Sequence, residues 1–265
     1  MGLSKMGNSN IAKKYLGTKE VVKEVLNGSV VYSKTPTPTP SVDPILANNS
    51  WATIKAVCES GQASNYWSVG DTKTDIGTDN IVRTFRICDM QGLYSKHVVF
   101  EQTQREVGGQ VWNTSTNTDD NNAYNDYNIA NIRTTMNTTI KALYSSDLQS
   151  ALTQTTVKVA KNGNNGTLVD VTDYLFLPAE KEIFGSASYS RSEEASALTQ
   201  YQYYATHNTA SDRIKQKLDN SGAGYWWLRS PRSSSTSNVC NVSSGGGADN
   251  SGAGYMNGVA PCFAF

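Results

Sequence analysis

The sequence predicts an α+β fold, and three observations support that prediction. Short segments in which apolar residues recur with helical spacing are interspersed with short segments rich in β-branched residues. Regular internal repeats are absent, and so are alternating βαβ units. A barrel, a solenoid and a Rossmann fold are therefore disfavoured, and short helices beside irregular antiparallel strands are expected.

Composition limits the functional classes. The chain has 265 residues, a formal net charge of +0 and a charged fraction of 17%. This length predicts one large domain with a smaller appendage, and the charge gives no signal for nucleic acid or an anionic membrane as a partner. No apolar run approaches the roughly 20 residues that cross a bilayer. The N-terminus lacks the apolar core of a secretory signal, so we expect synthesis in the bacterial cytoplasm without a signal peptide and no membrane insertion.

Residues 1–34 are predicted to form a small β module. Two segments, 14–21 and 23–32, have strand character and look like a degenerate repeat. Asn27 and Gly28 form a dipeptide typical of a hairpin turn. The pattern resembles the short N-terminal β modules of phage structural proteins, which implies attachment to other virion subunits. A frayed N-terminal arm is the alternative, because so small a module is marginal alone.

Alternating Thr and Pro residues mark a domain boundary. They predict an extended, polyproline-like linker over residues 35–42. The large domain is therefore predicted to cover residues 43–265.

Within the large domain, the spacing of apolar residues predicts elements in a mixed order. Ser50 is expected to cap a helix whose apolar stripe contains Trp51, Ile54, Val57 and Cys58. In chain order we then expect strands at 81–87 and 97–101, helices at 127–143 and 147–152, strands at 155–160 and 168–171 joined by a turn, a buried strand at 174–178, and a short helix at 179–184.

The tract 232–257 has an unusual composition. It lies between two apolar, strand-like segments, 224–231 and 258–265. It contains no Lys, Glu, Gln or Trp and is rich in Ser, Gly and Asn. Every residue type in it except Met256 has a codon that ends in a pyrimidine, which is the set reached when the two adenines of an Asn codon are randomised. A flexible Ser/Gly linker is the alternative, but linkers do not usually end a chain on an aromatic strand.

Four stretches carry a resemblance to a known protein class: 176–185 (FLPAEKEIFG), 226–231 (WWLRSP), 238–242 (NVCNV) and 258–265 (GVAPCFAF). With them the sequence resembles variable proteins of diversity-generating retroelements, of the gut-phage type with a C-type-lectin-like domain related to formylglycine-generating enzymes. The resemblance implies a fixed framework and a variable region at about 227–265, where scattered positions differ between copies of the gene. The reactive cysteine pair of those enzymes has no matching motif here, so no enzymatic activity is expected.

The resemblance and the residue types together predict which positions bind ligand. Small polar side chains with an occasional aromatic ring are the composition of antibody paratopes. Arg232 and Tyr255 are the expected anchors, while Val239 and Val242 are expected to face inward. The predicted ligand-binding, variable residues are Arg232, Ser233, Ser235, Asn238, Asn241, Ser243, Ser244, Asp249, Asn250, Ser251, Tyr255 and Asn257.

These observations lead us to expect a receptor-binding, tropism-determining phage tail or fibre protein, located in the virion. Its lectin-like surface would bind a protein or glycan on the host cell, and the N-terminal module would contact other virion subunits. Many copies on one particle would raise avidity, with homo-oligomerisation left open. The alternative is a diversified adhesin of bacterial or prophage origin that is not part of a virion.

No catalytic, metal or cofactor site is predicted. His97 and His207 stand in no catalytic or metal-binding spacing. Residues 119–122 and Asp126 offer oxygen atoms for calcium but lack the register of a calcium loop, so a hydrated loop is preferred. The four cysteines form no CxxC motif and are expected as free, buried thiols, and a disulfide between Cys240 and Cys262 would require an oxidising compartment.

Overall fold

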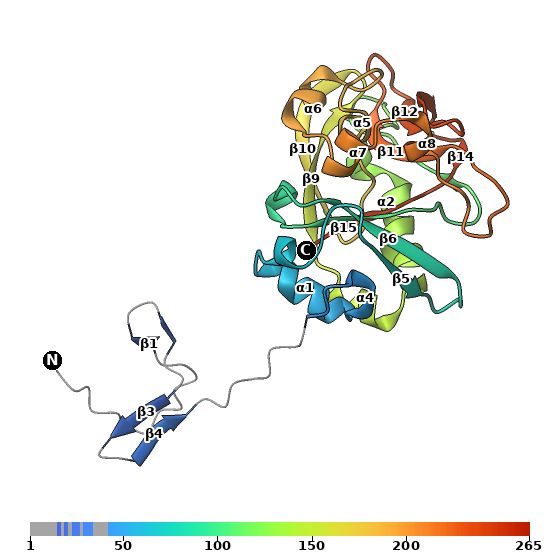
Figure 1. Cartoon of the computed structure of the whole chain (residues 1–265). Coiled ribbons are helices and arrows are strands. Elements are labelled where there is room, and N and C mark those ends of the chain that lie inside the picture. Colours follow the sequence, from blue (N-terminus) through green and yellow to red (C-terminus); the bar gives the residue numbers. More distant parts are fainter. Residues whose placement is uncertain (1–14, 17–18, 21–22, 27–28, 34–41) are drawn as a thin grey trace. The chain divides into compact units, whose positions relative to one another are not determined.

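The computed structural model describes residues 42–265 and four short strands before them, and the chain divides into two compact units, Met1–Ser41 and Val42–Phe265 (Figure 1). In the first unit, β1 pairs with β2 and β3 with β4, both antiparallel, with Leu26 opposite Ser29. This pairing confirms the predicted hairpin, whereas its Asn27-Gly28 turn and linker residues 35–41 lie outside the described residues. The strands are β1 (Tyr15–Leu16), β2 (Lys19–Glu20), β3 (Lys23–Leu26) and β4 (Ser29–Ser33).

An antiparallel sheet of four strands forms the centre of the large unit. Its strand order is β15-β7-β6-β5. The last strand of the chain, β15, therefore pairs with β7, and the sequence between these two strands makes up more than half of the residues of the unit. The predicted strand at 81–87 and its partner at 97–101 are confirmed as β6 and β7. The four strands are β5 (Thr72–Ile76), β6 (Val82–Asp89), β7 (Val99–Gln102) and β15 (Cys262–Ala264).

Helix α1 (Trp51–Glu59) covers this sheet with its apolar stripe and lies beside α4 (Ser146–Ala151). Ser50 caps α1 as predicted, because its Oγ accepts a hydrogen bond of 3.1 Å from the Thr53 amide. The Asp147 carboxylate accepts a second one, 2.9 Å from the Trp51 amide. The start of α1 is therefore fixed by its own cap and by α4.

The predicted helix at 127–143 begins later than the sequence indicates. The carboxylate of Asp126 accepts a hydrogen bond from the Asn128 amide and starts a single 3-10 turn, so the regular helix begins only at Asn131. The apolar residues Ile132, Met136 and Ile140 are buried as predicted. The segments in order are η4 (Tyr127–Ile129), α2 (Asn131–Thr135), the π-helical η5 (Met136–Ile140) and α3 (Lys141–Leu143).

A long hairpin, β9 (Thr155–Asn162) and β10 (Asn165–Asp173), confirms the two strands predicted at 155–160 and 168–171. Short helices follow it and include the predicted one at 179–184: α5 (Glu180–Phe184), α6 (Ser192–Ala197), α7 (Gln202–Thr206) and α8 (Ala210–Arg213). Single 3-10 turns lie at η1 (Leu46–Asn48), η2 (Ala63–Asn65) and η3 (Leu93–Ser95).

The prediction of a buried strand at 174–178 is wrong. Within it only Phe176 forms a strand-like bridge, to Cys262. The amide of Leu175 donates instead to the side chain of Asn137, and that of Leu177 to the hydroxyl of Tyr127. The segment is apolar and buried, but side chains rather than a second strand satisfy these backbone groups.

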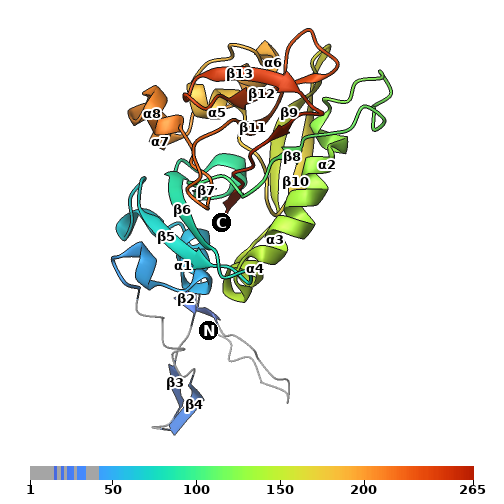
Figure 2. The same ribbon diagram turned by 90° about the vertical axis from the view of Figure 1, so that its right-hand side faces the viewer.

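The tract 232–257 is folded, so the alternative of a flexible linker is wrong. It supplies two strands of an antiparallel sheet with the order β11-β12-β13 (Figure 2). A short pair, β8 with β14, joins the end of the tract to the middle of the chain. These strands are β8 (Gln110–Val111), β11 (Trp226–Pro231), β12 (Asn238–Val242), β13 (Ala248–Gly252) and β14 (Met256–Asn257).

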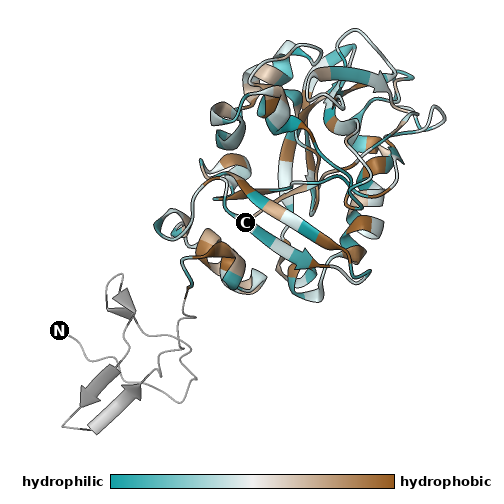
Figure 3. Cartoon of the chain, turned by 45° about the vertical axis from the view of Figure 1, so that its right-hand side comes forward, coloured by the Kyte–Doolittle hydropathy of each residue, from teal (hydrophilic) through white to brown (hydrophobic). Residues whose placement is uncertain are grey.

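Hydrophobic residues concentrate in the helices and strands of the large unit, while its loops are largely hydrophilic (Figure 3). The sequence expectation of an α+β fold is confirmed by this mixture of short helices and small antiparallel sheets. Among the described residues, no helix has the length and apolar character needed to span a membrane.

Candidate functional site

The β12–β13 hairpin presents most of the predicted ligand-binding residues. β13 is the edge strand of its sheet, and every residue of β13 is partly exposed. In the neighbouring strand β12, Val239 and Val242 are fully buried, as expected for framework residues. The hairpin therefore places small polar side chains on a packed support.

One group of predicted residues is linked by hydrogen bonds at the start of β12. The Asn238 amide donates to Ser235 Oγ over 2.9 Å, and Asn238 Nδ2 donates to Asn250 Oδ1 over 2.9 Å. All three residues are partly exposed. The structure thus brings Ser235, Asn238 and Asn250 together from three different places in the tract.

A second group lies around Asn241, which faces Asp249 across the two strands. Asn241 Nδ2 donates to Ser251 Oγ over 2.7 Å. The prediction that Asn241 contacts ligand is corrected here, because its side chain is 0% exposed. β12 is the middle strand of the sheet, so Asn241 positions Ser251 from within the sheet, and Asp249 and Ser251 remain at the surface.

The remaining predicted residues lie at the two ends of the hairpin. Ser243 and Ser244 form the turn between β12 and β13, whereas Arg232 and Ser233 lie in the loop before β12, as the strand bounds show. Strands rise about 3.4 Å per residue, so the five residues of β12 separate these ends by roughly 17 Å. Tyr255 and Asn257 follow β13, and Tyr255 is 69% exposed. The predicted residues form a band along the hairpin rather than one cluster, and strand alternation places Asn250 on the face opposite Asp249 and Ser251.

Two residues that the sequence did not identify hold the loop 232–237. Asn125 is fully buried, and its Nδ2 donates to the carbonyl oxygens of Ser235 and Asn238 over 3.0 and 2.8 Å. The carbonyl of Gly163 accepts from the Ser234 amide over 2.7 Å, and a Cβ at position 163 would come within 2.0 Å of backbone oxygens in this loop. The asparagine-rich composition around Asn125 indicated only a loop, so neither contact could be found from the sequence.

The acidic stretch near Asn125 is committed to internal hydrogen bonds. The Asp119 carboxylate accepts from the amides of Asn121 and Ala123 and from the Asn162 side chain, over 2.7 to 2.9 Å. Asp126 caps η4, and burial raises its pKa to about 6. In the part of the chain that the structure describes, no group of three or more potential metal ligands is found.

Buried charges lie under β11, the strand that begins the C-terminal sheet. Arg229 is fully buried, and its Nη1 donates to Glu182 Oε2 over 2.6 Å and to the Leu177 carbonyl over 2.9 Å. Glu194 is also fully buried, and its carboxylate accepts hydrogen bonds from Ser230 Oγ and from the Ala160 amide. Burial raises the pKa of Glu194 to about 7.

The free energy of unfolding is expected to fall as the pH rises from about 5 to 8, because of Glu194. Its folded-state pKa of about 7 exceeds the ordinary 4.5, so between these values the folded state binds more protons than the unfolded state. The difference corresponds to about 3 kcal/mol. In urea unfolding at several pH values, Glu194→Gln should remove this component. Glu193→Gln is the control, because the pKa of the exposed Glu193 is lowered to about 2, and an unchanged pH profile in Glu194→Gln would contradict the assignment.

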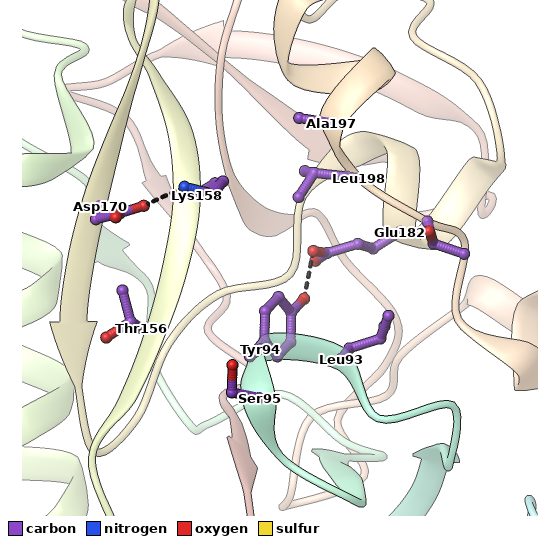
Figure 4. A pocket seen from close by; sticks show the side chains of 10 residues that line it. Leu93, Tyr94, Ser95, Thr156, Lys158, Asp170, Glu182, Ala197 and Leu198 are labelled. Carbon is purple, nitrogen blue, oxygen red and sulfur yellow. Dashed lines mark hydrogen bonds and ion pairs between the residues drawn. The ribbon is translucent and has the colours of Figure 1, made fainter.

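A pocket of about 390 Å³ lies between η3, the β9–β10 hairpin and α5 (Figure 4). Its volume is in the range of small-molecule sites, but its charged groups are already paired. Lys158 Nζ lies 2.8 Å from Asp170 Oδ1, and the Tyr94 hydroxyl donates to Glu182, which also holds Arg229. The charged side chains that line the pocket are therefore engaged within the protein.

The histidines and cysteines form no catalytic arrangement within the described residues. His97 and His207 are exposed, and neither lines the pocket. All four cysteines are buried free thiols, including Cys240 and Cys262, for which a disulfide was the conditional alternative. Burial raises their pKa, to about 12 for Cys58, so the thiols are protonated and poorly nucleophilic at neutral pH.

Comparison with known proteins gives one family. Residues 94–265, which are more than half of the chain, match the domain of unknown function DUF6273. The match begins at η3 and so includes β7, β15 and the whole C-terminal sheet but not β5 and β6. No curated protein and no solved structure matches the chain.

Proposed function

We propose a receptor-binding function for this chain, which belongs to the DUF6273 family. In this proposal the large unit is a C-type-lectin-like domain of a phage tail or fibre protein, and its tract 232–257 binds a protein or glycan on the host surface. The N-terminal module attaches to other virion subunits. The observation that carries the proposal is the band of partly exposed, small polar side chains on the rigid β12–β13 hairpin.

The chemistry of the hairpin suits recognition. Ser, Asn and Asp side chains donate and accept hydrogen bonds in many geometries, and the exposed Tyr255 adds an aromatic contact. Because the strands are already ordered, binding would cost less conformational entropy than it would for a free loop. Weak individual contacts would be reinforced by many copies on one particle.

The separation of buried and exposed positions supports diversification of the tract. Val239, Cys240 and Val242 are fully buried, whereas the positions around them on β13 and in the loops are partly exposed. Substitutions at the exposed positions would change the surface without creating cavities in the core. A near-copy of the coding segment beside a reverse-transcriptase gene, with differences only opposite adenines, is expected downstream of this gene.

Replacing Arg232, Asp249, Asn250 and Tyr255 together with alanine should abolish adsorption to host cells and leave the fold intact. Each of these side chains is partly or largely exposed, and surface substitutions usually change stability by less than about 0.5 kcal/mol. Adsorption of particles carrying the variant would be measured beside the thermal unfolding midpoint of the purified protein. Adsorption is expected to fall by at least about tenfold, because residues that anchor an interface contribute about 1.4 kcal/mol or more to the binding free energy.

Lys158→Ala with Asp170→Ala is the matched control. Both side chains are more than half exposed, but they lie on β9 and β10, outside the tract. The control should adsorb like the wild type. Full adsorption by the folded tract variant would refute the proposal, whereas binding of the isolated protein to bacteria without any role in a particle would favour an adhesin.

A further inference from the structure

Arg105 is a buried arginine whose guanidinium has no hydrogen-bond or ion-pair partner among the described residues. Its side chain is 7% exposed, and its Nε is enclosed without a hydrogen bond. Among the described residues, no acid lies within ion-pair distance of it. The other deeply buried arginines are paired, Arg83 with Glu106 at 2.8 Å and Arg229 with Glu182. Of its guanidinium nitrogens only Nε is enclosed without a hydrogen bond, so the terminal nitrogens remain available to a ligand.

Two glycines hold the Arg105 side chain in place. A Cβ at Gly224 would lie 2.3 Å from Nη2 of Arg105, and a Cβ at Gly258 would lie 2.4 Å from its Cδ. The Arg105 backbone is fixed as well, because its amide donates to the Gln216 carbonyl over 2.9 Å and its carbonyl accepts from Leu218 over 3.1 Å. The backbone hydrogen bonds and the close packing against the two glycines therefore restrict where the guanidinium can lie.

No carboxylate among the described residues pairs with Arg105 directly. Lys217 lies next to it through a strand-like bridge, and Asp219 is the acid that acts on it most strongly, from beyond ion-pair distance. Burial lowers the pKa of Arg105 and Asp219 opposes this, but a guanidinium stays protonated at neutral pH. Arg105 therefore keeps a positive charge that no direct contact with a described carboxylate neutralises.

Exposed apolar side chains surround this position. Val107, Tyr225 and Met256 are 45%, 40% and 68% exposed. The segments that carry them run side by side near Arg105, since the Glu106 amide donates to Val259 and the Gly258 amide donates to Tyr225, each over 2.8 Å. Exposed aromatic and apolar groups beside a fixed charge are typical of binding surfaces.

We propose that Arg105 binds a carboxylate group of the ligand, next to Tyr225. The terminal nitrogens of the guanidinium donate to the carboxylate oxygens, a planar pairing that favours carboxylate over a point anion. That the ligand comes from the host surface rests on the proposed function. Arg105 itself belongs to the framework of the domain and not to the tract 232–257. It predicts that varied tracts on this framework share an acidic ligand.

The probe for this site is acetate, titrated at constant ionic strength into the full-length protein. The amide resonances of Gly224, Tyr225 and Gly258 should shift and saturate with acetate and not with chloride. Arg105→Met should abolish the shift, and Arg191→Met, which removes an arginine paired with Glu193, should keep it. Arg105→Met should also raise the unfolding midpoint, because an unpaired buried charge is removed.

Two results would overturn the inference: no saturable shift with acetate, or an undiminished shift in Arg105→Met. A marked fall in the unfolding midpoint of Arg105→Met would also count against it, since the guanidinium would then be satisfied within the fold. Host adsorption is a separate measurement. If the tract variant loses adsorption but the protein has no acetate site, only the inference is refuted. If the protein has an acetate site but particles that carry it never adsorb to host cells, only the proposed function is refuted.

Discussion

Replacing Arg229 with methionine is expected to lower the free energy of unfolding by about 3–5 kcal/mol. Arg229 and Glu182 are both fully buried, and Arg229 Nη1 lies 2.6 Å from Glu182 Oε2. Without the guanidinium, the Glu182 carboxylate stays buried and its negative charge is unpaired. Denaturant unfolding at neutral pH, followed by tryptophan fluorescence and circular dichroism, measures the effect.

The size of this effect follows from what else Arg229 holds. Its backbone amide donates to the Pro178 carbonyl, its Nε to the Lys158 carbonyl and its Nη1 to the Leu177 carbonyl, over 2.9 to 3.1 Å. These bonds connect β11 to the irregular segment before α5 and to β9. Methionine leaves two of these buried carbonyls without their donor, in addition to the isolated carboxylate.

Two further variants separate charge from packing. Arg229→Met combined with Glu182→Met removes both charges, so it should recover much of the lost stability, as replacements of whole buried ion pairs do. Lys158→Met removes an exposed pair with Asp170 and should cost less than about 1 kcal/mol. A loss below about 1 kcal/mol in Arg229→Met would show that water reaches this pair and would contradict its description as a buried one.

Elements that depend on neighbouring residues could be predicted from the sequence. The cap at Ser50, strand β6 and the β9–β10 hairpin are each determined within a few residues by a capping side chain, an alternating pattern or a turn. The mixed fold class follows from these elements. The start of the helix at Asn131 also depends on a local contact, the cap at Asp126. The sequence did not predict this start, because the apolar residues from Tyr127 onward already have helical spacing.

Long-range pairings could not be predicted. The segment 174–178 has the apolar composition of a strand, but a strand requires a partner, and β15 pairs with β7 instead. The burial of Asn241 depends on β12 being the middle strand, which the residue types of the tract do not indicate. Asn125 and Arg105 depend on contacts with residues about a hundred positions away, such as Ser235 and Gly224. A single sequence contains no signal for such contacts.

Replacing Phe263 with alanine is the second large loss that we expect, at about 3–5 kcal/mol. Its ring stacks on Phe100 at 5.2 Å and meets the rings of Trp51 and Phe85 edge-on at 5.6 and 5.3 Å. All four side chains are essentially inaccessible to solvent. Alanine would remove apolar area and leave a cavity that the surrounding aromatic rings, fixed in a helix and two other strands, cannot fill.

The same replacement tests how the C-terminal strand is held. Phe263 lies opposite Phe100 in the β15–β7 pair, so amide exchange in β7 should accelerate together with that in β15 if the cluster fastens this edge of the sheet. Phe184→Ala is the control, because that ring is only partly buried beneath Arg213 and should cost less. Exchange that accelerates only in β15, with global stability unchanged, would show that the central sheet does not need its last strand. The β12–β13 hairpin makes no ladder with β15, so the proposed host binding, measured below the unfolding midpoint, should survive Phe263→Ala.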